Sequence, residues 1–126
     1  MIELTKAEEQ IMQQLWQLEK AFVKEIVDRL PQPKPAYNTV STIVRILEKK
    51  GFVAHDAFGK SHRYYPLVSK KAYTRGFMKG FLNNYFSNSF KNLVSFFAKD
   101  KSLSIAEMEE LKNMLEVEIE RQKNNA

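Results

Sequence analysis

The sequence has no cysteine, and this absence removes several kinds of chemistry at once. No disulfide framework, thiolate metal site or cysteine nucleophile can be built from it. His55 and His62 are its only histidines, and no metal-ligand spacing joins them to nearby carboxylates. With four glycines in 126 residues, the chain also contains no glycine-rich phosphate loop and no nucleophile motif. We therefore expect no catalytic residues, no metal and no other cofactor.

Long hydrophobic runs are missing as well. No stretch approaches the ~18 uncharged apolar residues that a membrane-spanning helix needs. The first residues, Met1 to Lys6, lack the basic and then apolar pattern of a signal peptide. A composition of 44% hydrophobic and 28% charged residues is typical of a globular protein. The sequence therefore predicts a soluble, cytoplasmic protein with no membrane insertion.

The formal net charge of +5 is unevenly distributed along the chain. Between Lys34 and Lys71, eight basic residues stand against only Glu48 and Asp56, a net charge of +6, whereas the rest of the chain is close to neutral. Scattered lysines usually do no more than keep a surface soluble. An excess concentrated in one third of the chain instead favours a polyanionic partner.

The first fifty residues are predicted to form three helices. Thr5 to Glu8 is a capping-box pattern, and the helix that it begins should end near Glu19-Lys20. A shorter second helix cannot continue through the prolines that start at Pro31. The third helix is expected over residues 36–50, with Gly51 as its stop. The positions expected to face the core are Ile11, Leu15, Leu18, Val23, Ile26, Val27, Leu30, Val40, Ile43, Val44 and Leu47.

After the third helix, the hydrophobic period changes from that of a helix to that of a strand. Residues 52–55 and 63–67 are predicted to be two short strands, joined by a turn that contains a glycine and Lys60. Tyr64 and Tyr65 alternate, so one should pack inward while the other points outward. Three helices followed by a basic hairpin is the order of a winged helix-turn-helix. We expect this fold over residues 1–68, in a mainly α chain with a small β-hairpin.

Residues 69–126 are rich in aromatic side chains at helical spacing, and breaks near 87–89 and 100–102 separate three predicted helices. A core of this size is marginal alone, and exposed faces of this kind exceed what soluble monomers tolerate. We therefore predict a helical dimerisation domain; packing of these faces onto the N-terminal part of the same chain is the alternative. The expected interface residues are Phe77, Phe81, Tyr85, Phe90, Leu93, Val94, Phe97, Met108, Leu111 and Leu115.

The polar side of the third helix is the candidate working surface. The major groove of DNA admits one helix, and short polar or basic side chains read base edges there. Arg45 can donate two hydrogen bonds to a guanine or bind a phosphate. The hairpin is weaker evidence for DNA binding. We expect His62 and its basic neighbours to reach flanking phosphates; a hairpin tip that is merely solvated is the alternative. The candidate DNA-binding residues are Asn38, Thr39, Ser41, Thr42, Arg45, Lys49, Lys50, Lys60 and Arg63.

Five stretches carry a family resemblance: residues 4–16, 39–52, 64–68, 90–94 and 104–111. Together they cover nearly the whole chain and resemble the penicillinase repressors, a family of BlaI/MecI/CopY-type winged-helix transcriptional repressors, nearer the BlaI/MecI branch. The resemblance implies a homodimer on an inverted-repeat operator whose half-sites lie one helical turn (~34 Å) apart. It also implies control of β-lactam resistance or related genes. Relief would come from a membrane sensor-protease system and cleavage in the dimerisation part.

Three features depart from the family pattern. Staphylococcal members are cleaved at an Asn-Phe bond, whereas the matching candidate cleavage region here is Phe96-Phe97. Copper-responsive members carry cysteines near the C-terminus, and their absence here excludes thiolate copper sensing. Ser41 and Ile46 stand where the related repressors carry arginines, so the operator sequence of those repressors should not be transferred to this chain.

Two other functions stay open on the sequence alone. A winged helix can serve as a protein-protein interaction module with an incidental basic face. A shallow dependence of DNA affinity on salt would indicate this function. A metabolite-responsive winged-helix regulator would instead need a ligand pocket among the aromatic residues between 77 and 97.

Overall fold

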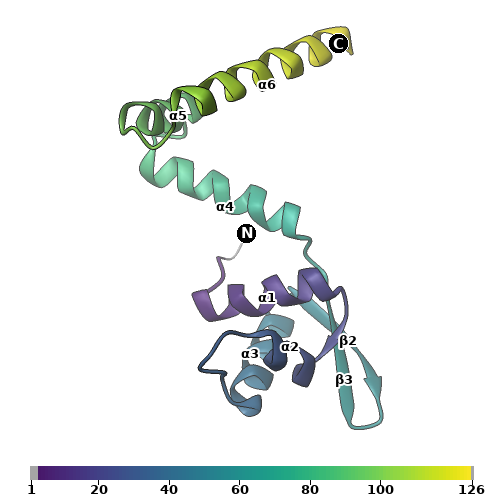
Figure 1. Cartoon of the computed structure of the whole chain (residues 1–126). Helices are drawn as coiled ribbons and strands as arrows, with labels where there is room; N and C mark the ends of the chain where they lie inside the picture. Colours follow the sequence, from purple (N-terminus) through teal and green to yellow (C-terminus); the bar gives the residue numbers. More distant parts are fainter. Residues whose placement is uncertain (1–2, 126) are drawn as a thin grey trace. The chain divides into compact units, whose positions relative to one another are not determined.

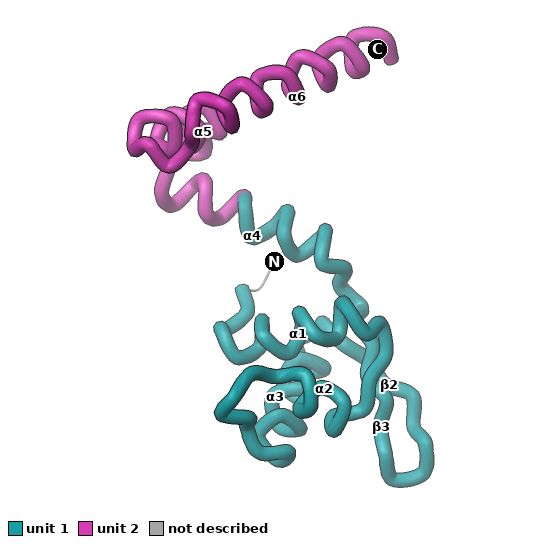
Figure 2. Tube along the Cα trace, in the orientation of Figure 1, with its two compact units in different colours: residues 1–78 teal, residues 79–126 magenta. Residues whose placement is uncertain are grey.

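A computed structural model describes residues 3–125 and divides the chain into two compact units, residues 1–78 (unit 1) and 79–126 (unit 2) (Figures 1 and 2). The division falls inside the fourth helix, whereas the sequence placed a domain boundary near residue 68. Within the described residues the chain is mainly helical, with six α-helices and one small three-stranded sheet.

The three N-terminal helices form where the sequence predicts them. Helix α1 (Lys6–Leu18) begins with the predicted capping box: the Thr5 amide donates to Oε1 of Glu8 at 2.8 Å, and the Glu8 amide donates to Oγ1 of Thr5 at 3.2 Å. Helix α2 (Val23–Arg29) ends before the prolines, and α3 (Tyr37–Lys49) ends before Gly51. These boundaries confirm the capping and stop signals.

The sheet contains one strand more than the sequence predicts. Strands β2 (Val53–Phe58) and β3 (Ser61–Pro66) form the expected antiparallel hairpin, but they extend further toward the tip, so that only two residues remain in the turn. Gly59, the first of these two, has φ +62°, which glycine adopts without steric cost. A two-residue strand, β1 (Ala21–Phe22), pairs with the other side of β3, and the strand order is β1-β3-β2.

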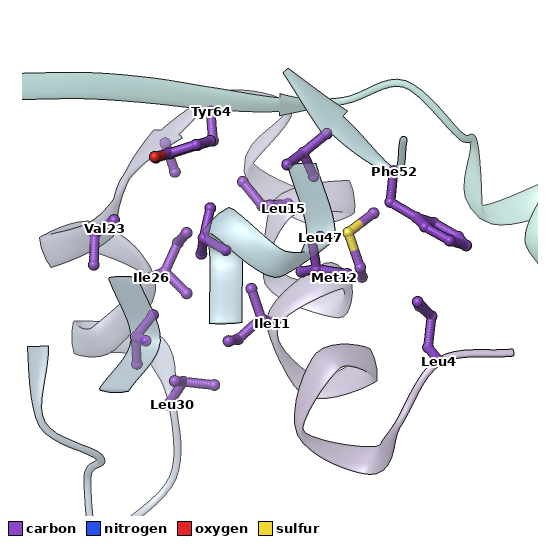
Figure 3. Packing of buried hydrophobic residues seen from close by; sticks show 14 of the residues in the cluster. Leu4, Ile11, Met12, Leu15, Val23, Ile26, Leu30, Leu47, Phe52 and Tyr64 are labelled. Atoms are coloured by element: carbon purple, nitrogen blue, oxygen red, sulfur yellow. The ribbon is translucent and has the colours of Figure 1, made fainter. Parts of the chain in front are cut away.

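The core of unit 1 lies between the three helices and the sheet (Figure 3). The apolar stripes of α1, α2 and α3 meet there, and Tyr64 from β3 joins them, which identifies the inward member of the tyrosine pair. Tyr73 from the fourth helix is also part of this cluster, a contribution that the sequence did not reveal. The buried members include Leu4, Ile11, Met12, Leu15, Val23, Ile26, Leu30, Val40, Val44, Leu47, Phe52 and Val53, whereas Leu18, Val27 and Ile43 are partly buried.

Three helices follow the sheet, as predicted: α4 (Lys70–Tyr85), α5 (Phe90–Lys99) and α6 (Ile105–Asn124). Helix α5 begins at a Ser89 cap, and α6 begins at a second capping box formed by Ser104 and Glu107. No residue of α5 or α6 is buried, although both helices carry large apolar side chains. No helix within residues 3–125 is long and apolar enough to cross a membrane.

Candidate nucleic-acid interface

Helix α3 presents a polar side to solvent because its apolar residues recur at helical spacing and turn inward. Val40, Val44 and Leu47 are fully buried. Two local hydrogen bonds lie along the exposed side: the Thr42 hydroxyl donates to the carbonyl oxygen of Asn38 at 2.9 Å, and Nε of Arg45 donates to that of Ser41 at 3.4 Å. The Thr42 hydroxyl uses its one donor in this way and can still accept a hydrogen bond, whereas Arg45 keeps its other guanidinium donors. The exposed residues of this side are Asn38, Thr39, Thr42, Arg45, Ile46 and Lys49.

A polar cleft of about 210 Å³ separates α3 from the hairpin. Arg45 lines it from the helix and Lys60 from the hairpin turn, so that two cations from distant parts of the sequence share one cavity. Hydroxyl groups and an imidazole supply further hydrogen-bonding atoms, and no carboxylate lines the cleft. Such a cavity suits an anionic group. The other lining residues are Val23, Tyr37, Ser41, Ser61, His62 and Tyr64.

The hairpin face toward α3 is held by a chain of contacts between aromatic and charged side chains. His55 donates from Nδ1 to Oε2 of Glu48 on α3 at 2.6 Å. The rings of His55 and His62 are stacked, with centroids 4.0 Å apart and an interplanar angle of 6°. Burial raises the pKa of Tyr64, and the nearby charge of Glu48 adds to this effect, while Arg45 opposes it. These contacts fix His62 at the cleft, where it lies beside Lys60.

Arg63 lies on the opposite face of the hairpin, because successive residues of a strand alternate. Its guanidinium packs over the ring of Phe58, 5.0 Å from the centroid, and its Nε is buried without a hydrogen-bond partner in the described structure. Lys20 lies near the same face, 3.7 Å from Asp56 and over the ring of Tyr65. Arg63 therefore does not line the cleft with Lys60.

Lys50 also lies apart from the exposed side of α3. Its Nζ is 2.9 Å from both Oε1 and Oε2 of Glu8, whose side chain is only 6% exposed. Burial acts to raise the pKa of Glu8, but the hydrogen bonds from Lys50 and from the Thr5 amide outweigh it, so the pKa is lowered. Lys50 thus holds the end of α3 to the start of α1. The Glu8 partner was missed because it lies far away in sequence.

The nine predicted DNA-binding residues thus fall into three groups. Ser41, Arg45 and Lys60 line the cleft, whereas Arg63 and Lys50 are engaged elsewhere. The remaining four, Asn38, Thr39, Thr42 and Lys49, are exposed on α3. Among residues 3–125 no group of three or more histidine or acidic side chains is arranged to hold a metal ion.

Comparisons with known proteins identify relatives of this chain. The family profile described as penicillinase repressor matches residues 4–117. The methicillin resistance regulatory protein MecI of Staphylococcus aureus (strain N315) is 31% identical over 114 residues, which cover 90% of this chain and 93% of that protein. MecI of Mammaliicoccus sciuri is 30% identical over the same shares of both chains.

Two solved structures show the fold. The solution structure of the DNA-binding domain of the repressor BlaI matches 56% of this chain and 88% of that chain, with a TM-score of 0.50 and 24% identity. The complex structure of hsRosR-S4 matches 79% of this chain and 91% of that chain, with a TM-score of 0.52 and 15% identity. The winged-helix fold expected from the sequence is confirmed.

Proposed function

Because the chain belongs to the penicillinase repressor family of transcriptional repressors, we propose that it represses by binding an inverted-repeat DNA operator as a homodimer. The observation that carries this proposal is the exposed polar side of α3 beside a cleft with two cations and no carboxylate. A helix in the major groove reads base edges, while basic groups around it bind phosphates. A transcriptional repressor of this family is not an enzyme.

The two parts of this surface have different tasks. Thr42 and Arg45 project from the middle of α3, where base edges are within reach of a helix in the groove. The cleft between Arg45 and Lys60 receives a backbone phosphate, which positions the protein without reading sequence. Ser41 at the cleft wall and Ile46 on the exposed side provide fewer cationic donors than arginines would. The operator preference therefore differs from that of relatives with arginines at these positions.

Unit 2 supplies the contacts for a dimer. Its helices leave large apolar side chains exposed in the single chain, among them Phe90 (65%), Leu115 (56%) and Val94 (53%). Exposed apolar patches of this kind mark interaction sites, and burial of these side chains against a second copy removes them from water. Linked half-site contacts then bind cooperatively, because the second half binds at high effective concentration.

The name of a relative supports a proposal for the regulated genes, and the family resemblance supports one for the inducing event. MecI is named a methicillin resistance regulatory protein, and we propose that this chain controls β-lactam resistance or related genes. Relief occurs by cleavage in the dimerisation part, after a signal from a membrane sensor-protease system. Phe96 and Phe97 are 52% and 40% exposed on α5. A protease acts there after local unwinding, since a regular helix does not fit an extended active site.

The first test is a titration of the full chain on a duplex from upstream of its own gene, at two salt concentrations and with a scrambled duplex as control. We expect tight binding with two chains per duplex, a preference over the scramble, and a steep fall with salt. Arg45→Ala should weaken specific binding by about 1–3 kcal/mol and reduce the preference. Lys123→Ala removes the same charge from α6 and should change little. Equal, weak binding to both duplexes would refute operator recognition.

The dimer is tested by sedimentation of the full chain. Leu115→Glu places a charge among the exposed apolar residues of α6 and should produce a folded monomer, because Leu115 is 56% exposed in the single chain. Asn113→Glu adds the same charge roughly half a turn away on that helix, on the other side, and should leave the dimer intact. A Leu115→Glu protein that remains a dimer would contradict the assignment of this face.

A further inference from the structure

A second pocket lies in unit 1, away from the cleft beside α3. Its volume is about 170 Å³, and residues of α1 and of the first half of α4 line it. It shares no lining residue with the cleft, and operator recognition as proposed above leaves it unused. The residues that line it are Glu9, Gln13 and Trp16 from α1, and Tyr73, Thr74 and Phe77 from α4.

One wall of the pocket is aromatic and held in place. The ring centroids of Trp16 and Tyr73 lie 6.0 Å apart, and those of Tyr73 and Phe77 lie 6.4 Å apart. Nε1 of Trp16 donates to the carbonyl oxygen of Val68 at 2.9 Å, and the Tyr73 hydroxyl accepts from the Leu4 amide at 3.1 Å. Because the polar ends of the two rings are used in this way, their positions are fixed. Tyr73 is only 6% exposed, so the half-buried Trp16 offers more of the apolar, electron-rich surface than Tyr73 does.

The other wall brings negative charge to these rings. Glu9 is half-buried, and its Oε2 lies 3.5 Å from the Tyr73 hydroxyl, a long contact that leaves most of the carboxylate's hydrogen-bonding capacity unused. Burial raises the pKa of Tyr73; the hydrogen bond with the Leu4 amide opposes this shift, and the charges of Glu9 and Glu3 reinforce it. Glu9 is the one charged residue among those that line the pocket, so the lining carries a negative charge although the whole chain carries a formal charge of +5.

We propose that this pocket binds a small organic cation, a substituted ammonium whose charge lies at the Glu9 carboxylate and whose alkyl groups pack on Trp16. Ring faces attract cations through their quadrupole, and most strongly when the ring is that of tryptophan. An anion is repelled by the carboxylate. A small metal ion would gain little binding free energy here, since one carboxylate replaces few of its water ligands. The site is independent of operator binding and stands whether or not the proposed function holds.

Trp16 makes the test direct, because it is the only tryptophan of the chain and it lines the pocket. Choline is titrated into the full-length protein while tryptophan emission is recorded. Dimethylbutanol, in which carbon replaces the charged nitrogen, is the neutral control of the same shape. We expect a saturable change with choline, and at least about tenfold weaker binding of dimethylbutanol, since a contribution of 1.4 kcal/mol is tenfold in affinity.

A variant pair locates the charge. Glu9→Gln keeps the shape of the side chain and should weaken choline binding about tenfold, whereas Glu120→Gln, an exposed carboxylate on α6, should leave it unchanged. Circular dichroism of each variant verifies the fold, and the comparison of choline with dimethylbutanol on the unaltered protein needs no variant. Absence of a saturable change, equal binding of the neutral analogue, or full affinity in Glu9→Gln would each overturn the proposal.

Discussion

The ion pair between Glu8 and Lys50 allows a sharp test of how unit 1 is held together. Substitution of Lys50 by methionine keeps an unbranched apolar stem but removes the ammonium group. Glu8 would then retain the hydrogen bond from the Thr5 amide and lose both contacts of 2.9 Å to Nζ, while its side chain stays buried. A carboxylate that remains buried without its partner is strongly destabilising.

The expected cost follows from the burial of the two partners. A fully buried pair costs roughly 3–5 kcal/mol when one partner is removed. The Lys50 side chain is 28% exposed and the Thr5 amide remains, so we expect Lys50→Met to lower the free energy of unfolding by about 2 kcal/mol. Glu8→Gln should cost only about 1 kcal/mol, because the amide oxygen still accepts from Thr5 and the lysine can turn to water.

The double variant completes the cycle. Once Glu8 is glutamine, the ammonium group has no carboxylate to neutralise, so Glu8→Gln/Lys50→Met should be about as stable as Glu8→Gln alone. Methionine at position 50 should therefore lower the free energy of unfolding substantially when residue 8 is a glutamate and only slightly when it is a glutamine. If Lys50→Met lowers the free energy of unfolding equally with glutamate and with glutamine at position 8, the loss does not come from an unpaired buried charge.

The pH dependence has a definite sign. The pKa of Glu8 is lowered in the folded protein, so its stabilisation is present above the ordinary value of 4.5 and is lost as the pH falls through the lowered pKa. Urea unfolding at about pH 7 and about pH 4, at one fixed protein concentration, measures this. The cost of Lys50→Met should shrink at the acidic pH. Two results at neutral pH would refute the reasoning. One is a Lys50→Met protein as stable as the unaltered one, and the other is a smaller loss of unfolding free energy for Lys50→Met than for Glu8→Gln.

Two further outcomes follow from other contacts. If Lys60 binds a phosphate from the cleft, Lys60→Gln should reduce the steepness of log affinity against log salt by about 1 and retain the preference for the operator over a scrambled duplex. Salt titrations of both proteins measure this slope, and an unchanged slope would remove Lys60 from the interface. Tyr73→Phe should destabilise the protein by about 1–2 kcal/mol, because the buried Leu4 amide loses its acceptor; urea unfolding measures it, and a neutral effect would mean that another acceptor replaces the hydroxyl.

The helices were predictable because their signals are local. Thr5, Ser104 and Gly51 mark ends that the structure reproduces, and the polar side of α3 follows from the helical period alone. Strand β1 was not predictable in this way. Two residues, Ala21 and Phe22, have no alternation of their own and become a strand only through their hydrogen bonds to β3.

The candidate site was predictable in part, for a similar reason. Ser41 and Arg45 share a side of α3 that the helical period defines, but their cleft with Lys60 depends on where the hairpin folds back. The sequence could not distinguish Lys50, which binds Glu8, from the exposed Lys49, because Glu8 is 42 residues away along the chain. Arg63 differs: strict alternation along β3 already separates it from His62, and that signal was available in the sequence.

The two-residue length of β1 leaves the outer part of the hairpin with open edges. Beyond the pairing of Phe22 with Arg63, β3 has no neighbour except β2, and β2 lies at the edge of the sheet along its whole length. Unpaired strand edges are templates for edge-to-edge aggregation, and lysine at an edge discourages it. We therefore expect the charge of Lys60, in the turn between these two strands, to discourage edge-to-edge aggregation of the protein. Substitutions that neutralise this tip should be checked for aggregation before a change in DNA affinity is interpreted.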